Sequence, residues 1–146
     1  MSKLKNYTSQ VPASRSMAKI ENMLVQVGAK NINKEYVGEK ITAFYFLVDV
    51  EGTSRLFKLP VKTNSIYKVL EKEVKRPSEN TYKNIEAQSE RTAWKIICDW
   101  VEIQCTLIKL EQVELSQVFL PYVYDPNSNT TLWEQVKEGS VKLLGE

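Results

Sequence analysis

The sequence predicts a single α+β domain, in which a three-stranded antiparallel meander packs on a long central helix, with two flanking helices and a short C-terminal helix. Three observations predict it. Residues 31–59 are rich in β-branched and aromatic side chains, amphipathic helix patterns lie on both sides of them, and residues 90–110 form an apolar stretch of helical period. A chain of 146 residues can bury a sizeable core in one domain.

The first 13 residues are predicted to form an extended lead-in, and residues 14–146 the domain. Pro12 and the Thr8-Ser9 pair disfavour a helix in the lead-in. Ser14 or Ser16 offers an N-cap for the first helix, and Gly28 stands where a helix commonly ends. Between them apolar residues recur with the spacing of an amphipathic helix: Met17, Ile20, Leu24 and Val27.

Two turn signals, Gly38-Glu39 and Glu51-Gly52, divide the β-rich stretch into strands near 31–37, 41–50 and 53–59. Both sets of alternating residues in the middle strand are largely apolar. We therefore expect this strand to be central and covered on both faces.

A second helix is predicted over residues 64–75, with Thr63 or Asn64 as its cap. The polar stretch "RPSENTYKN" is expected to be a loop, and the long third helix to run from about Asn84 to Leu110. Two opposite faces of that helix are apolar, which predicts burial on most sides. One face carries Trp94, Ile97, Cys98, Val101, Cys105 and Ile108, and the other Ile96, Trp100, Ile103, Leu107 and Leu110.

After the third helix, Pro121 and Pro126 exclude a long helix, so a short apolar segment is expected along the core. Thr131 and Glu134 match a capping box for a last short helix, "LWEQVKEG", closed by Gly139.

Catalytic chemistry has little support in this composition. The chain has no histidine, which removes the commonest general base and metal ligand. Cys98 and Cys105 would lie about 10 Å apart along one helix, too far for a disulfide, and are predicted to be buried free thiols. A Ser-Lys catalytic arrangement stays open, but no catalytic residue, metal site or cofactor is assigned, and we lean against an enzyme. Asp99 and Glu102 could bind a divalent cation; a solvated helix face is the alternative that we favour.

The charge is unevenly distributed along the chain. Residues 1–80 carry 14 Lys and Arg against 8 Asp and Glu, whereas residues 81–146 carry 6 against 10. Cations along a track beside aromatic rings are what binding of a single nucleic-acid strand needs. The nucleic-acid candidates lie on the third strand and second helix, which we expect to be neighbours: Lys58, Lys62, Lys68, Lys72, Lys75, Arg76 and Tyr67. An ordinary solvated helix face explains the same pattern.

The acidic C-terminal half is rich in aromatic residues, which could instead form an anchor for a protein partner or for a homodimer. The candidates are Phe119, Tyr122, Tyr124 and Trp133. Packing of these side chains over the third helix is the alternative.

Four blocks occur in order along the chain: "YTSQVP", "LFKLPV", "ERTAWKIICDWVEIQ" and "VFLPYVYD". With them the chain resembles, over nearly its whole length, a family of small, uncharacterised proteins encoded by tailed bacteriophages and prophages. Cys98 departs from the family pattern, in which a lysine is more usual. The resemblance implies a virus-infected bacterial cell as the setting and supplies no activity.

These observations favour a non-catalytic phage accessory protein that binds nucleic acid during replication or recombination. A protein-binding inhibitor of a host enzyme or defence system is the alternative. The N-terminus has no apolar signal-peptide region, and the longest apolar stretch, residues 43–50, is too short to span a bilayer. We therefore expect a cytoplasmic protein of the host bacterium without a membrane partner.

Overall fold

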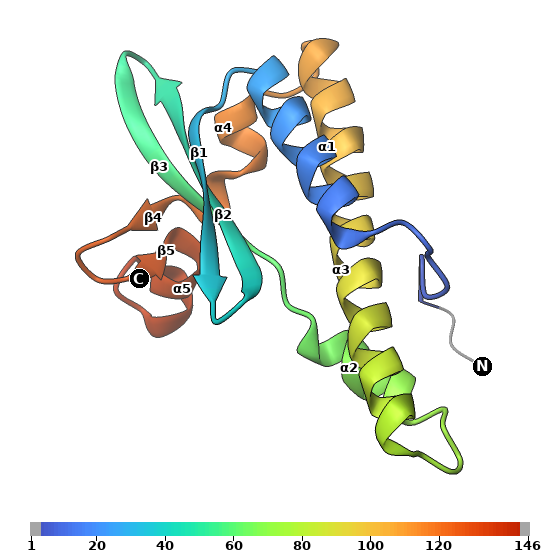
Figure 1. Ribbon diagram of the computed structural model, residues 1–146. Helices are drawn as coiled ribbons and strands as arrows, with labels where there is room; N and C mark the ends of the chain where they lie inside the picture. The colour runs from blue at the N-terminus through green and yellow to red at the C-terminus, as the bar shows by residue number, and fades with distance from the viewer. Residues whose placement is uncertain (1–3, 144–146) are drawn as a thin grey trace. The chain divides into compact units, whose positions relative to one another are not determined.

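The computed structural model describes residues 4–143 and confirms the α+β fold class, with a three-stranded antiparallel sheet, a long helix and several shorter helices (Figure 1). The elements follow in the order α1 (Ala13–Gln26), β1 (Lys30–Val37), β2 (Lys40–Val50), β3 (Thr53–Pro60), α2 (Asn64–Glu71), α3 (Glu79–Lys109), α4 (Leu115–Val118), η1 (Leu120–Tyr122), β4 (Tyr124–Asp125), β5 (Thr130–Thr131) and α5 (Leu132–Glu138).

The described residues form two compact units. The first comprises the described parts of Met1–Met23 and Val61–Ile103, and the second those of Leu24–Pro60 and Gln104–Glu146. Helices α1 and α3 contribute residues to both units. In this part of the chain no helix has the length and apolar character needed to cross a membrane.

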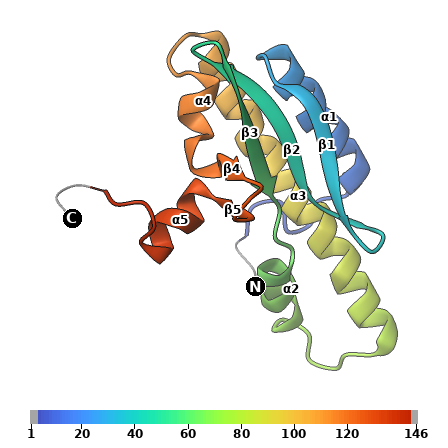
Figure 2. The ribbon, with the colours of Figure 1, turned by 90° about the vertical axis from the view of Figure 1, so that its left-hand side faces the viewer.

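The sheet of the second unit has the strand order β1-β2-β3, and its strand bounds agree with the prediction to within one residue (Figure 2). Gly38 and Gly52 occupy the two turns with φ of 63° and 81°, a left-handed conformation that glycine adopts without a steric penalty. The register of β2 and β3 places Tyr45 opposite Lys58 and Phe46 opposite Phe57. Because neighbouring residues of a strand point to opposite faces, these two pairs lie on opposite faces of the sheet.

One face of the sheet carries an aromatic core. Phe46 and Phe57 stack with ring centroids 5.5 Å apart, and Phe119 meets Phe46 edge-on at 5.6 Å. All three are fully buried. On the opposite face Tyr45 and Leu47 are only half-buried. The prediction that β2 is covered on both faces therefore holds fully for the aromatic face and only in part for the other.

The chain then passes around the β3 edge of the sheet. Phe119 packs on the aromatic face, Val123 forms an isolated antiparallel bridge with Phe57, and the Tyr124 ring contacts Tyr45 on the opposite face. The segment 119–124 thus covers part of an edge whose backbone groups would otherwise be open to another strand.

Helix α3 begins five residues earlier than predicted, at Glu79. The Ser78 hydroxyl accepts a hydrogen bond from the Thr81 amide at 3.3 Å, as an N-cap does. Only the first part of the predicted 76–84 loop is therefore irregular, because Ser78 caps a helix that includes the rest.

Burial along α3 is one-sided. Trp94, Cys98 and Val101 are at most 1% exposed, whereas Ile103 and Leu110 on the opposite apolar face are 59% and 64% exposed. Ile96, Trp100 and Leu107 on this second face are half-buried, so the predicted burial on most sides holds there only in part. Both cysteines are buried and neither forms a disulfide, as predicted.

The predicted extended lead-in is instead a turned segment hydrogen-bonded to α3; its residues 1–3 lie outside the described part. We call residues 4–11 the N-terminal strap. The carbonyl of Asn6 accepts a bond from the Thr92 hydroxyl at 2.9 Å, and the carbonyl of Ser9 accepts bonds from Gln88 at 3.1 Å and Arg91 at 3.2 Å. The φ of Asn6 is 63°, a conformation that asparagine tolerates and that an extended chain lacks.

Candidate functional site

The predicted basic residues fall mainly in the first unit, in the segment from Lys62 to Arg76 that we call the basic segment. Lys62 precedes α2, Lys68 lies in it and Lys72 is its C-cap residue. The segment contains five cations and two carboxylates. It therefore carries a net positive charge in every conformation it adopts.

Helix α2 ends at Glu71, four residues before its predicted end. After it the backbone forms turns with bonds between residues three apart: the Glu73 amide donates to the Leu70 carbonyl and the Val74 amide to the Glu71 carbonyl, both at 3.2 Å. Pro77 disfavours helical geometry at Arg76, so the helix does not resume before the proline. Lys75 and Arg76 consequently lie outside the helix, and the prediction that they lie on the second helix is wrong.

The cations of the basic segment are available to a ligand. Lys62, Lys68, Lys72, Lys75 and Arg76 are all exposed. Among the described residues, none of the ion pairs that the structure shows involves them. A phosphate backbone could contact them without first breaking an internal salt bridge.

Two tyrosines belong to the same unit. Tyr67 is half-buried on α2, and Tyr82, in the first turns of α3, is 39% exposed. Burial raises the pKa of Tyr67, and nearby Glu71, Tyr82 and Glu86 raise it further. Tyr67 thus lies within the basic segment, and Tyr82 lies near the start of the following helix.

Lys58, the remaining predicted cation, belongs to the second unit and is engaged there. Its ammonium lies 3.3 Å from the Glu35 carboxylate, 5.5 Å from the centroid of the Tyr45 ring and 5.4 Å from that of Tyr124. Its side chain is 21% exposed. Lys58 on β3 therefore contacts side chains of β1, β2 and β4. The basic segment of the first unit defines the candidate nucleic-acid surface without it.

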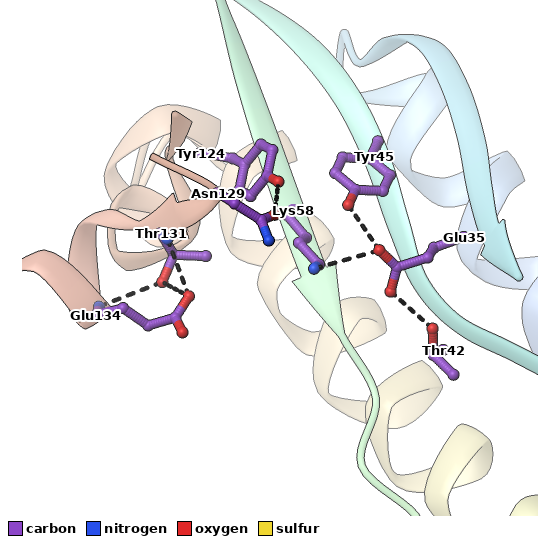
Figure 3. A network of polar contacts seen from close by, with 8 residues as sticks. All are labelled: Glu35, Thr42, Tyr45, Lys58, Tyr124, Asn129, Thr131 and Glu134. Atoms are coloured by element: carbon purple, nitrogen blue, oxygen red, sulfur yellow. Dashed lines mark hydrogen bonds and ion pairs between the residues drawn. The ribbon is translucent and has the colours of Figure 1, made fainter. Parts of the chain in front are cut away.

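Figure 3 shows the polar network around Lys58. The Glu35 carboxylate accepts hydrogen bonds from the hydroxyls of Thr42 and Tyr45, both at 2.8 Å. These two bonds, with the Tyr45 bond as the larger cause, and the Lys58 ammonium hold the pKa of Glu35 below its usual range. Burial and the neighbouring Glu35 raise the pKa of Tyr45, which therefore stays a protonated donor.

The C-terminal part of the network fixes the β4–β5 hairpin and the start of α5. The Tyr124 hydroxyl bonds to the Asn129 side chain. The predicted capping box is confirmed: the Glu134 amide donates to the Thr131 hydroxyl at 3.3 Å, and the Glu134 carboxylate accepts from the Thr131 amide at 3.0 Å. Gly139 ends α5 with φ of 85°, as predicted.

The four residues predicted to contact a protein partner have different environments. Phe119 is fully buried in the aromatic core and takes no part in a surface anchor. Tyr122 and Tyr124 are half-buried, whereas Trp133 is 55% exposed. Leu120, which the sequence reasoning did not select, is 52% exposed and lies in η1, against which α5 packs.

Asp99 and Glu102 are both engaged by lysines, which favours the solvated, ion-paired helix face over a cation site. Asp99 accepts bonds from Lys95 at 2.6 Å and from Asn6 at 2.9 Å, while Glu102 pairs with Lys19. Burial opposes ionisation of Asp99, but these bonds hold its pKa below the usual range. In the described part of the chain no group of three or more acidic or cysteine side chains is placed to hold a metal ion.

Sequence reasoning missed the Glu35–Lys58–Tyr124 network. The register of the meander could have placed Tyr45 opposite Lys58, since both lie on predicted strands. The sequence around Tyr124, however, does not indicate that this residue, 66 positions after Lys58, completes the cluster.

Fold and site together define a small α+β protein with an exposed basic segment in one unit and a partly buried ion-pair and aromatic network in the other. Comparison of the chain with family models, with curated proteins and with solved structures finds no match.

Proposed function

We propose that this protein is a non-catalytic phage accessory protein that binds nucleic acid through its basic segment. The observation that supports the proposal is the exposure of five cations, Lys62, Lys68, Lys72, Lys75 and Arg76, outside the ion pairs of the described residues. Binding by phosphate contacts is sequence-independent and sensitive to salt. This activity suits the replication or recombination of a phage genome in a virus-infected bacterial cell, the setting that the sequence resemblance implies.

Tyr67 and Tyr82 favour a single strand over a duplex as the ligand. Unstacked bases can stack on exposed aromatic rings, whereas the bases of a duplex cannot reach them. Tyr82 is the more exposed of the two rings. We expect Tyr82→Ala to weaken single-strand binding more than duplex binding.

The test is fluorescence anisotropy with labelled single- and double-stranded DNA at 50 and 200 mM salt. The variant is Lys68→Ala/Lys72→Ala/Arg76→Ala. Each lost contact to a single strand lowers the slope of log K against log salt by about 0.7, so the triple variant should lower it by about 2.

The matched control is Arg15→Ala/Lys137→Ala/Lys142→Ala, which removes the same charge from other exposed positions. It should change the slope much less. No binding by the intact protein at 50 mM salt, or an equal loss in both triple variants, would end the proposal.

A protein-binding inhibitor of a host enzyme or defence system is the second candidate, and the exposure of Trp133 favours it. Large aromatic side chains anchor many protein interfaces. In this case a tagged protein purified from host cells should retain a partner that Trp133→Ala loses and that Tyr36→Ala, at an exposed position of β1, retains. Light scattering of the purified protein distinguishes a homodimer from a monomer.

A further inference from the structure

The side chains around Lys58 have the arrangement of a cation-binding cage. The rings of Tyr45 and Tyr124 meet nearly edge to face, at 70° with centroids 5.4 Å apart, and form two walls of a corner (Figure 3). The ammonium of Lys58 lies over both rings, 5.5 and 5.4 Å from their centroids. The Glu35 carboxylate, 3.3 Å from the ammonium, supplies the opposite charge.

This corner has the properties that attract an ammonium ion. Aromatic faces bind cations within about 6 Å of the ring centroid, and the attraction grows as water is excluded. The Lys58 and Glu35 side chains are 21% and 31% exposed, so the corner is screened from solvent only in part.

The walls of the corner are held by contacts that do not depend on Lys58. The Tyr45 hydroxyl donates to Glu35 at 2.8 Å, and the Thr42 hydroxyl donates to the same carboxylate at 2.8 Å. Tyr124 bonds to Asn129 within its hairpin, and the adjacent Val123 forms a bridge with Phe57 of β3. Removal of the Lys58 side chain should therefore leave the cage in place and vacant.

We propose that Glu35, Tyr45 and Tyr124 form an ammonium-binding site, which the chain's own Lys58 fills in this structure. The ligand class is an alkylammonium group, such as a lysine side chain of another protein or its methylated form. A tethered lysine competes at an effective concentration of about millimolar or more, so an outside ligand binds only after Lys58 leaves. Lys58 adds its cation contacts to an attachment that the Phe57–Val123 bridge already makes, and an outside ligand would have to displace the Lys58 ammonium in order to bind. The proposal is independent of nucleic-acid binding by the basic segment.

The test is titration of the Lys58→Ala variant with n-butylammonium chloride, followed by NMR of the tyrosine ring protons. Sodium chloride at the same ionic strength corrects for salt. We expect saturable shifts in Lys58→Ala and none over the same range in the wild-type protein or in Lys62→Ala, which removes an exposed lysine but leaves the cage filled. Adding Tyr124→Leu to Lys58→Ala should weaken binding about tenfold, because one aromatic wall is lost.

Identical titrations of Lys58→Ala with and without Tyr124→Leu would overturn the proposal, as would equal binding by the wild-type protein. A second measurement uses the wild-type protein, in which Lys58 fills the cage. Reductive methylation of the wild-type protein should modify Lys58 more slowly than Lys62, and Tyr124→Leu should speed the reaction at Lys58. Equal rates at Lys58 and Lys62 would contradict occupation of the site.

Discussion

The aromatic core of the second unit gives a sharp prediction for Phe119. The Phe119 ring is fully buried and meets Phe46 edge-on at 5.6 Å, and Phe46 in turn stacks on Phe57. Replacing a buried phenylalanine by alanine removes its transfer free energy and leaves a cavity, at a cost of about 3–5 kcal/mol. With a urea m-value of about 2 kcal/mol per molar, the midpoint of unfolding should fall by about 2 M.

The adjacent residue supplies the control. Leu120 is 52% exposed, so Leu120→Ala should change the free energy of unfolding by only about 0.5 kcal/mol. Urea unfolding followed by far-ultraviolet circular dichroism measures both variants. If Phe119→Ala cost no more than Leu120→Ala, the reasoning that the segment after α4 is anchored in the sheet core would be refuted.

Three further predictions follow from the polar and thiol groups. The pKa of Glu35 is lower in the folded state, so its stabilising contribution is present above the unfolded carboxyl pKa of about 4.3 and is lost as the pH falls through the folded pKa. In urea titrations, Glu35→Gln should therefore lose less stability than the wild-type protein between pH 6 and pH 3. An equal loss in the two proteins would count against the network. Thr131→Ala should lower the free energy of unfolding by about 1 kcal/mol, because it removes the N-cap of α5, and no measurable change would show that the cap does not stabilise the native state. Burial raises the pKa of the Cys98 and Cys105 thiols, so both should react with a thiol reagent much faster in urea than in the native protein, and equally fast native labelling would contradict their burial.

The meander could be predicted from the sequence because its signals are local. The turn glycines, Gly38 and Gly52, are required at left-handed positions, and the runs between them have β-forming composition. The capping box of α5 could also be predicted from the sequence, because the Thr131 and Glu134 side chains form their bonds within one helical turn.

Helix ends were harder to predict because competing signals overlap. Between Glu71 and Glu79 the chain contains both a proline and a capping serine. The polar stretch 76–84, which contains Pro77, is predicted to be one loop. Ser78, directly after the proline, caps α3, which begins at Glu79, while α2 ends at Glu71.

The N-terminal strap and the cage around Lys58 depend on contacts between residues distant in sequence. The Asn6 carbonyl accepts from Thr92, and the Tyr124 ring covers Lys58. Such contacts form only when the tertiary fold brings the two residues together. Residue spacing within one helix or strand cannot predict them. For the basic segment, composition indicated the residues, but only the structure showed that Lys58 is engaged elsewhere.

The most direct test of the central claim, that the basic segment binds nucleic acid, is acetylation footprinting of lysines with and without saturating single-stranded DNA. The account predicts that DNA protects Lys62, Lys68, Lys72 and Lys75 and leaves Lys137 and Lys142 as reactive as in the free protein. Equal reactivity of the basic segment in both states, or protection confined to Lys137 and Lys142, would contradict it.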